Sequence, residues 1–187
     1  HPVLLGHSLG GLIVLTFALL RKNREKISSL FVSAPSLKIK FHMMLFLKQL
    51  VAKYCLVYLC PRLKIPVGLD LRYLSHDKSV IQDYKKDPLV QNHLPISFAL
   101  DIVRAGEYVL CHANQIEKCP VFIAHGDADG IASSQGSVEV FNQIKSKKKI
   151  ILYPEFYHEL FNEEASKREL VLSDFKKWVF EIWQSQS

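Results

Sequence analysis

The chain has 187 residues, of which 49% are hydrophobic and 22% are charged, with ordinary numbers of glycine and proline. This composition is typical of a globular domain with one core, and it excludes a fibre or a low-complexity tail. The formal net charge of +6 favours anionic surfaces. Because the lysines are dispersed, or bunched only at residues 145–149 without a nucleic-acid-binding motif, we expect a lipid surface as partner and no nucleic acid.

The first predicted elements are a strand, a tight turn and a helix. Residues 2–5 form an apolar strand, residues 6–11 read Gly-His-Ser-Leu-Gly-Gly, and the apolar run that follows predicts a helix over 9–21. A glycine-flanked serine between a strand and a helix is the pattern of a nucleophile elbow. The sequence therefore predicts a serine held in a strained turn at the start of a helix.

Ser8 is the nucleophile that this elbow predicts. Gly6 and Gly10 are expected to avoid the collisions that a Cβ atom would make with the strand or the helix. The backbone N–H of Leu9 lies at the positive end of the helix dipole, where it can stabilise a developing oxyanion.

A second strand is predicted over 28–33, and the α/β alternation then stops over a long insertion, at about 36–105. Residues 41–59 of this insertion are unusually apolar and are punctuated by lysines. Such a surface suits a helical lid that dips into lipid headgroups or receives an acyl chain, although any helix packed on a sheet also needs an apolar face. The lid residues that we assign to substrate binding are Met43, Phe46 and Leu50.

Two later strands each end in a loop with reactive side chains. The apolar strand 121–124 is followed by Asp127 and Asp129, and the strand 149–153 is followed by His158. In elbow enzymes of this architecture the acid and then the base follow the nucleophile in chain order. His158 is therefore the predicted base, and spacing alone leaves the acid open between the two aspartates.

Helices predicted over 135–144 and about 167–183 complete the alternation, which indicates a mostly parallel sheet with helices on both faces. Histidines elsewhere in the chain are interpreted as packing or hydrogen-bonding residues without a catalytic role. These are His7, His42, His76, His93 and His112.

The chain resembles the monoacylglycerol lipase and lysophospholipase branch of the α/β-hydrolases, also called the serine aminopeptidase S33 type. The motifs that carry the resemblance are residues 6–11, 32–35, 84–89, 125–129 and 157–164. In that family the acid follows His-Gly by two variable residues, which selects Asp129 and leaves Asp127 as a turn residue. The resemblance implies an α/β-hydrolase fold and a triad of Ser8, Asp129 and His158 that hydrolyses lipid esters through an acyl-serine.

Monoacylglycerol and lysophospholipid are the substrates that the resemblance favours, without a cofactor. The four cysteines lack the close pairing of a zinc site, so no metal is expected. Two alternatives stay open: an acyltransferase or thioesterase with the same triad, and a truncated, inactive chain that binds a lipid or a partner.

Family members reach the elbow at the fifth strand of an eight-stranded sheet, and a His-Gly loop after an early strand supplies their second oxyanion donor. This chain reaches its elbow at residue 6, so we expect about 100 further residues upstream. Residues 1–187 are then the later half of an α/β-hydrolase domain whose N-terminal strands are missing. We expect a cytoplasmic or peripheral membrane location, with membrane contact through the lid.

Overall fold

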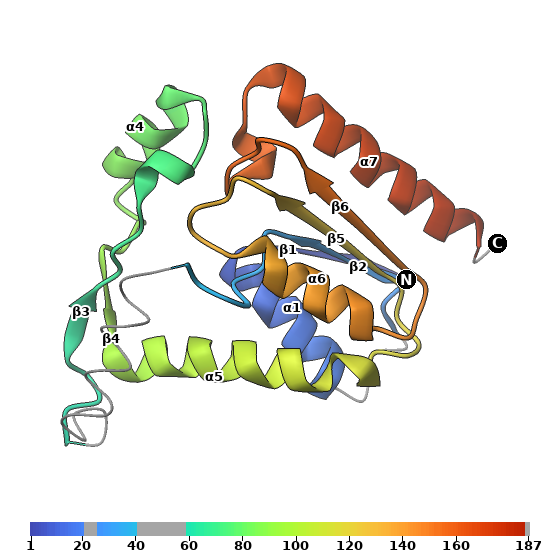
Figure 1. The fold of residues 1–187 in the computed structure, drawn as a ribbon, viewed down its shortest axis with the longest axis horizontal. Coiled ribbons are helices and arrows are strands. Elements are labelled where there is room, and N and C mark those ends of the chain that lie inside the picture. The colour runs from blue at the N-terminus through green and yellow to red at the C-terminus, as the bar shows by residue number, and fades with distance from the viewer. Residues whose placement is uncertain (21–25, 41–58, 186–187) are drawn as a thin grey trace.

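A four-stranded parallel sheet forms the centre of the molecule (Figure 1). The computed structural model describes residues 1–20, 26–40 and 59–185. The strands lie in the order β1 (Val3–His7), β2 (Ser29–Ser33), β5 (Val121–Gly126) and β6 (Lys148–Tyr153). All three pairings between them are parallel. Every residue of β2 and β5 is buried, as expected for central strands that are covered on both faces.

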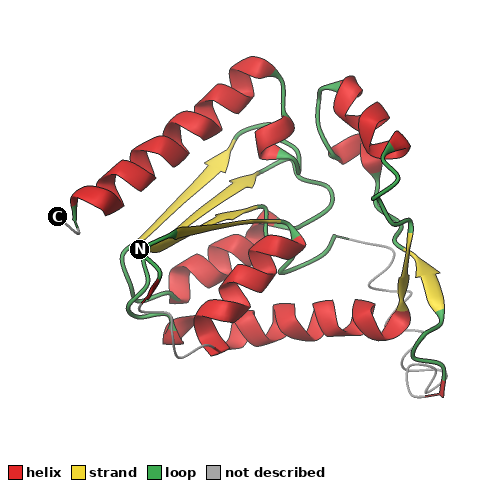
Figure 2. Cartoon of the chain, turned by 180° about the vertical axis from the view of Figure 1, so that it is seen from behind, coloured by secondary structure: helices red, strands yellow, loops and turns green. Residues whose placement is uncertain are grey.

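Helices cover both faces of this sheet, as Figure 2 shows from behind. One face is covered by α1 (Leu9–Leu20), α5 (Ile96–His112) and α6 (Ser134–Gln143). The other is covered by α7 (Ala165–Gln184). The predicted α/β architecture is confirmed, and each predicted element of the sheet layers ends within two residues of its observed bounds.

The alternation of side chains along the strands separates two apolar cores. In β2, Leu30 and Val32 pack toward α1, α5 and α6, whereas Phe31 packs toward α7. The ring of Phe31 meets that of Phe122 edge to face, with centroids 4.7 Å apart. Phe122 in turn contacts Trp178 of α7, with centroids 5.7 Å apart. Burial of each such ring contributes about 2 kcal/mol, so this aromatic column anchors α7 to the sheet.

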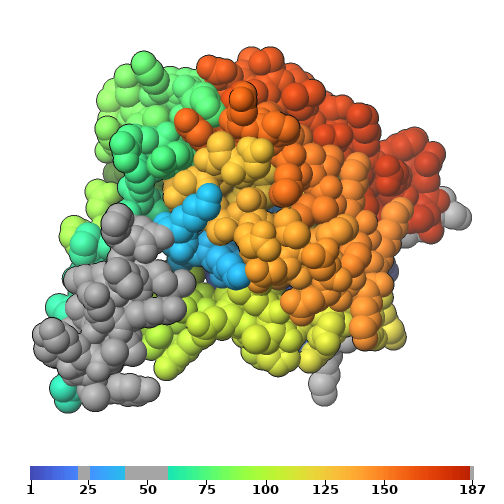
Figure 3. Space-filling model, viewed as in Figure 1, coloured from blue at the N-terminus to red at the C-terminus, as the bar shows by residue number. Residues whose placement is uncertain are grey.

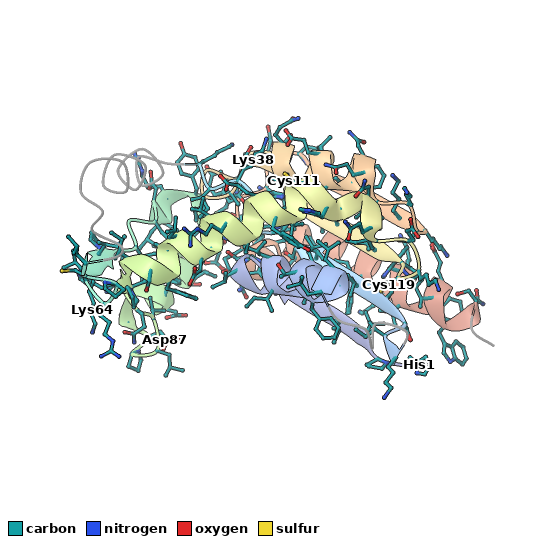
Figure 4. The ribbon with its side chains drawn as sticks, turned by 90° about the horizontal axis from the view of Figure 1, so that it is seen from below. His1, Lys38, Lys64, Asp87, Cys111 and Cys119 are labelled. Atoms are coloured by element: carbon teal, nitrogen blue, oxygen red, sulfur yellow. The ribbon has the colours of Figure 1, made fainter. Side chains whose placement is uncertain are left out.

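A cap segment, residues 59–95, stands at the end of the molecule toward which the strands point (Figure 1). It contains β3 (Lys64–Pro66), which pairs antiparallel with β4 (His93–Pro95), and α4 (Lys78–Lys86). The α4 helix begins after Asp77, whose carboxylate accepts the Ser79 N–H at 2.9 Å. Figure 4 shows Lys64 and Asp87 at one end of the molecule and His1 at the other.

The expected lid limit near residue 105 falls inside α5, a helix that packs against α1 beneath the sheet. Part of the predicted insertion is therefore a layer of the α/β body. Met43, Phe46 and Leu50 lie outside the described residues. In the described ranges, no helix is long and apolar enough to cross a membrane.

The segment after β2, residues 36–40, lies on the surface between α5 and α6 (light blue in Figure 3). The carbonyl of Lys38 accepts the Ser133 N–H at 2.7 Å, next to the start of α6. On the α5 side, a Cβ added to Gly106 would lie 2.7 Å from the carbonyl oxygen of Leu37. The glycine in the middle of α5 thus permits a close approach of this segment to the helix.

Candidate active site

Ser8 occupies the tight turn between β1 and α1. Its φ of 54° lies in the left-handed region, which is strained for a residue with a side chain. A Cβ added to Gly6 would lie 2.3 Å from the carbonyl oxygen of Gly10, so the turn requires glycine at position 6. The N–H of Ser8 donates to the carbonyl of Ser33 at 2.9 Å. This bond fixes the turn to the end of β2.

The steric role expected for Gly10 belongs instead to Gly11. A Cβ on Gly10 would meet no atom of the described residues within 4 Å. On Gly11 it would lie 3.0 Å from Cγ1 of Val32 and 3.1 Å from Cβ of Pro35. The expectation for Gly10 was wrong because the rotation of α1 over β2 decides which glycine faces the sheet, and the motif does not encode that rotation.

Ser8, His158 and Asp129 form a continuous line of hydrogen bonds across the carboxyl ends of the strands. His158 Nδ1 lies 2.7 Å from Asp129 Oδ2, and His158 Nε2 lies 2.8 Å from Ser8 Oγ. A carboxylate only accepts, so Nδ1 carries the proton and Nε2 accepts from the serine hydroxyl. The three side chains that the sequence singled out are thus within hydrogen-bond reach of one another.

Asp129 is fully buried, and each of its carboxylate oxygens has two partners. Oδ1 accepts the N–H groups of Ile131 at 2.7 Å and Ala132 at 3.0 Å. Oδ2 accepts from His158 at 2.7 Å and faces His125 Nε2 at 3.1 Å. Burial alone would raise the pKa of Asp129, but the hydrogen bonds from His125 and His158 outweigh it and hold the pKa well below its usual range. Asp129 is therefore ionised at neutral pH.

Asp127 stabilises a different turn. Its Oδ1 accepts the N–H of Glu155 at 2.7 Å. Glu155 has a φ of 61°, so this bond holds a left-handed residue in the loop after β6. Asp127 is the turn residue that the resemblance implied, and Asp129 is the aspartate that contacts His158.

The cap segment holds the loop that carries His158. The N–H of His158 donates to the carbonyl of Tyr73 at 3.0 Å, and that of Glu159 donates to the carbonyl of Leu74 at 2.8 Å. The Tyr73 ring also packs over Gly130, where an added Cβ would lie 2.2 Å from the ring. One turn of the cap therefore contacts both the acid loop and the base loop. No periodicity or motif in the sequence indicated these contacts.

A buried carboxylate, Glu163, strengthens this connection. It accepts the N–H groups of Tyr157 and His76, each at 3.0 Å, and the His76 ring at 2.9 Å. The His76 ring stacks on Tyr157 with centroids 3.7 Å apart. Burial raises the pKa of Glu163, but the hydrogen bonds from the Tyr157 N–H and from His76 together lower it by more. The pKa therefore lies below its usual range. An ionised group thus ties the cap to the base loop.

His7 joins the elbow to the same loop. Its Nε2 lies 3.2 Å from Glu159 Oε1, its Nδ1 lies 3.2 Å from Ser33 Oγ, and its ring centroid is 4.9 Å from that of His158. Burial raises the pKa of Glu159, but the hydrogen bond from His7 contributes to a net shift below the usual range. His7 is therefore a packing and hydrogen-bonding neighbour of the base, as predicted.

Two further groups lie beside the Ser8 hydroxyl. Leu9 is the first residue of α1, so its N–H has no acceptor within the helix, as a predicted oxyanion donor requires. Ser36 Oγ lies 3.1 Å from Ser8 Oγ. No motif in the sequence indicated Ser36, which follows β2 in a loop. Among residues 1–20, 26–40 and 59–185, no group of three His, Cys, Asp or Glu side chains could hold a metal ion.

Comparison with known proteins finds similar sequences among lipases. The chain is 32% identical over 185 residues to the monoacylglycerol lipase of Mycolicibacterium smegmatis, an alignment that covers 96% of this chain and 63% of that protein. It is 30% identical over 183 residues to the monoglyceride lipase of Saccharomyces cerevisiae, covering 93% of this chain and 58% of that protein.

A solved structure matches as well, that of a soluble variant of monoglyceride lipase from Saccharomyces cerevisiae in complex with a substrate analog. The TM-score is 0.85 at 28% identity, and the match covers 97% of this chain and 62% of that one. The chain thus spans about six-tenths of the length of these relatives. A family model described as serine aminopeptidase, S33 matches residues 2–165. With most of its length matched by that model, this chain belongs to the serine aminopeptidase S33 family and has the α/β-hydrolase fold.

Proposed function

We propose that this chain carries the catalytic triad of a serine esterase that hydrolyses carboxylic esters of lipids. The observation that carries the proposal is the line of hydrogen bonds from Ser8 Oγ through His158 to Asp129, with links of 2.8 and 2.7 Å. An ordinary serine hydroxyl is a weak nucleophile, and an adjacent base with its own orienting carboxylate is the arrangement that activates it.

The proposed reaction is acyl transfer to Ser8 followed by hydrolysis. His158 Nε2 takes the serine proton as Oγ attacks the ester carbon, and later gives that proton to the leaving alkoxide. Asp129 keeps the proton of the neutral ring on Nδ1 and stabilises the imidazolium that forms. The N–H of Leu9 donates to the oxyanion. Water then cleaves the acyl-serine, with His158 as its base.

Monoacylglycerol or lysophospholipid is the substrate class that we propose. Two relatives are named for hydrolysis of monoacylglycerols. The apolar, lysine-punctuated stretch over 41–59 supports an acyl-binding lid and peripheral contact with membranes. In this proposal Met43, Phe46 and Leu50 contact the acyl chain.

Covalent labelling of the intact protein tests the triad directly. A fluorophosphonate probe should modify Ser8, because such probes require an activated serine, and Ser8→Ala should abolish the modification. Ser36→Ala is the matched control, since Ser36 is the neighbouring hydroxyl at 3.1 Å, whereas the ring of His158 has its hydrogen bonds with Asp129 and Ser8 in the described structure. Labelling that survives in Ser8→Ala and disappears in Ser36→Ala would show that Ser36, and not Ser8, is the nucleophile.

Product analysis separates the proposed activity from its alternatives. Release of free fatty acid from a monoacylglycerol supports hydrolysis, whereas transfer of the acyl group to an added alcohol indicates an acyltransferase. Faster turnover of an acyl thioester than of the matching ester indicates a thioesterase. Retention of lipid without any labelling of Ser8 indicates a binding protein that has lost catalysis.

A further inference from the structure

A second histidine contacts the carboxylate of Asp129. His125 lies in β5, and its side chain is 0% exposed. Its Nε2 is 3.1 Å from Asp129 Oδ2, the same oxygen that contacts His158, and 3.3 Å from the carbonyl oxygen of Ala132. Its Nδ1 is 2.7 Å from Ser137 Oγ in α6. The reaction proposed above gives this buried ring no role.

The partners of His125 determine where its proton lies. Both groups that face Nε2, a carboxylate and a carbonyl, can only accept, so Nε2 carries a proton. The neutral ring then has an acceptor at Nδ1, which the hydroxyl of Ser137 satisfies by donation. A wholly buried imidazole is less costly to desolvate in this neutral form than as a cation. His125 is thus a fixed donor to Asp129, held in its tautomer by Ser137.

We propose that His125 is a positioning residue that orients Asp129 and weakens the basicity of His158. The inference rests on the proposed function. The N–H groups of the 131–132 backbone hold Oδ1, and His125 fixes the direction of Oδ2, so the carboxylate has no freedom to rotate away from His158. A carboxylate oxygen that already accepts one hydrogen bond stabilises a second donor less strongly. His125 therefore reduces the stabilisation of the His158 imidazolium, and the base stays unprotonated to lower pH.

The titratable surroundings allow this effect to be isolated. In the described part of the chain, His158 is faced by Asp129 and by His7, which is itself paired with Glu159. The ammonium of Lys40 donates to the backbone carbonyl of Asp129 at 2.8 Å, and this contact does not involve His125. His125 is faced by Asp129. A substitution of His125 leaves the contacts of His7 and Glu159 in place, so a change in the titration of the base reports on the carboxylate between the two rings.

Three variants of the intact protein test the inference with a short, soluble ester. His125→Leu removes the donor at similar volume, His125→Gln can place an amide N–H near the former Nε2, and Ser137→Ala removes the hydroxyl that fixes the tautomer. For His125→Leu we expect kcat to fall about ten- to hundredfold, as for loss of a hydrogen bond to a charged group, with KM nearly unchanged. We also expect the acid limb of its kcat/KM profile to move to higher pH. His125→Gln should recover most of the loss, and Ser137→Ala should shift the limb in the same direction by less.

A purely structural role for His125 predicts a different result. It would lower the melting temperature and the amount of active protein but leave the acid limb where it is, and that outcome would overturn the inference. Equal damage in His125→Gln and His125→Leu would overturn it as well. If His125→Leu fails to fold, Ser137→Ala serves instead: an unchanged acid limb in the kcat/KM profile of folded Ser137→Ala would overturn the inference. Fluorophosphonate labelling of the unmodified protein reports separately on the proposed function: labelled protein with an unmoved limb refutes the inference alone, and unlabelled protein refutes both.

Discussion

Replacing Asp129 by Asn should remove most of the activity without changing the shape of the side chain. The amide must place its oxygen toward either the loop backbone or the two histidines. If its nitrogen faced the loop, it would oppose the N–H groups of Ile131 and Ala132, which now donate to Oδ1 at 2.7 and 3.0 Å. The oxygen therefore takes the loop side, and the amide N–H₂ faces the rings of His125 and His158.

That orientation reverses the proton on the base. A donor facing His158 Nδ1 favours the tautomer in which Nδ1 accepts and Nε2 carries the proton. Nε2, which lies 2.8 Å from Ser8 Oγ, then cannot take the serine proton. A triad aspartate changed to asparagine lowers turnover by about 10,000-fold in a related arrangement. This factor corresponds to about 5 kcal/mol of lost transition-state stabilisation, and we expect a loss of that order here.

The matched control is Asp127→Asn. Asp127 uses one oxygen to accept the Glu155 N–H, and an asparagine oxygen can accept the same bond. Hydrolysis of a soluble ester by the intact protein should therefore fall by orders of magnitude for Asp129→Asn and remain close to normal for Asp127→Asn, with circular dichroism confirming that both fold. Activity of Asp129→Asn within tenfold of the unmodified protein, or equal losses in both variants, would refute the assignment of the acid.

Three further predictions concern the elbow, the buried Glu163 and the proposed lid. Gly6→Ala should lower the free energy of unfolding by about 3 kcal/mol, since its Cβ would lie 2.3 Å from backbone, whereas Gly10→Ala should not lower it; denaturant titration compares the two. Glu163 has a pKa below its unfolded value, so it contributes stability that is lost as pH falls below about 4.5. In thermal melts, Glu163→Gln should be less stable than the unmodified protein at pH 7, and its stability should fall less between pH 7 and acid pH. Phe46→Asp should slow hydrolysis of long-chain monoacylglycerols more than that of short esters, and equal losses would indicate misfolding instead.

The sheet and the triad could be predicted because their signals are local. A strand, a glycine-flanked serine and an apolar helix occupy adjacent positions in the chain, and the loops with Asp129 and His158 each follow an apolar strand directly. Parallel strands place their carboxyl ends at one edge of the sheet, so residues that are 150 positions apart, Ser8 and His158, meet without any long-range signal. The local pattern and the topology were sufficient for Ser8 and His158, whereas the choice of Asp129 over Asp127 needed the family resemblance.

The parts that the sequence did not predict depend on contacts between distant segments. The helix α5 begins at Ile96, inside the stretch read as an insertion, because its mixed apolar and polar residues did not mark it as a layer beneath the sheet. The bond between His76 and Glu163 joins residues 87 positions apart that carry no shared motif. The second histidine on the acid lies within the family motif, but its ring direction follows from the pleat of β5 and from Ser137 in α6.

These distant contacts meet at His158, which lies in the loop after β6. A loop residue has backbone freedom that catalysis cannot tolerate, because displacement of the base by about 1 Å can cost a hundredfold in rate. The carbonyl of Tyr73 in the cap accepts the N–H of His158 and so restrains its backbone. The next residue, Glu159, is restrained by its pairing with His7. Glu163 fixes the cap to the same loop. The cap segment thus helps to position His158. A substitution that shifts the cap segment should therefore change kcat even where the substituted residue does not contact the substrate.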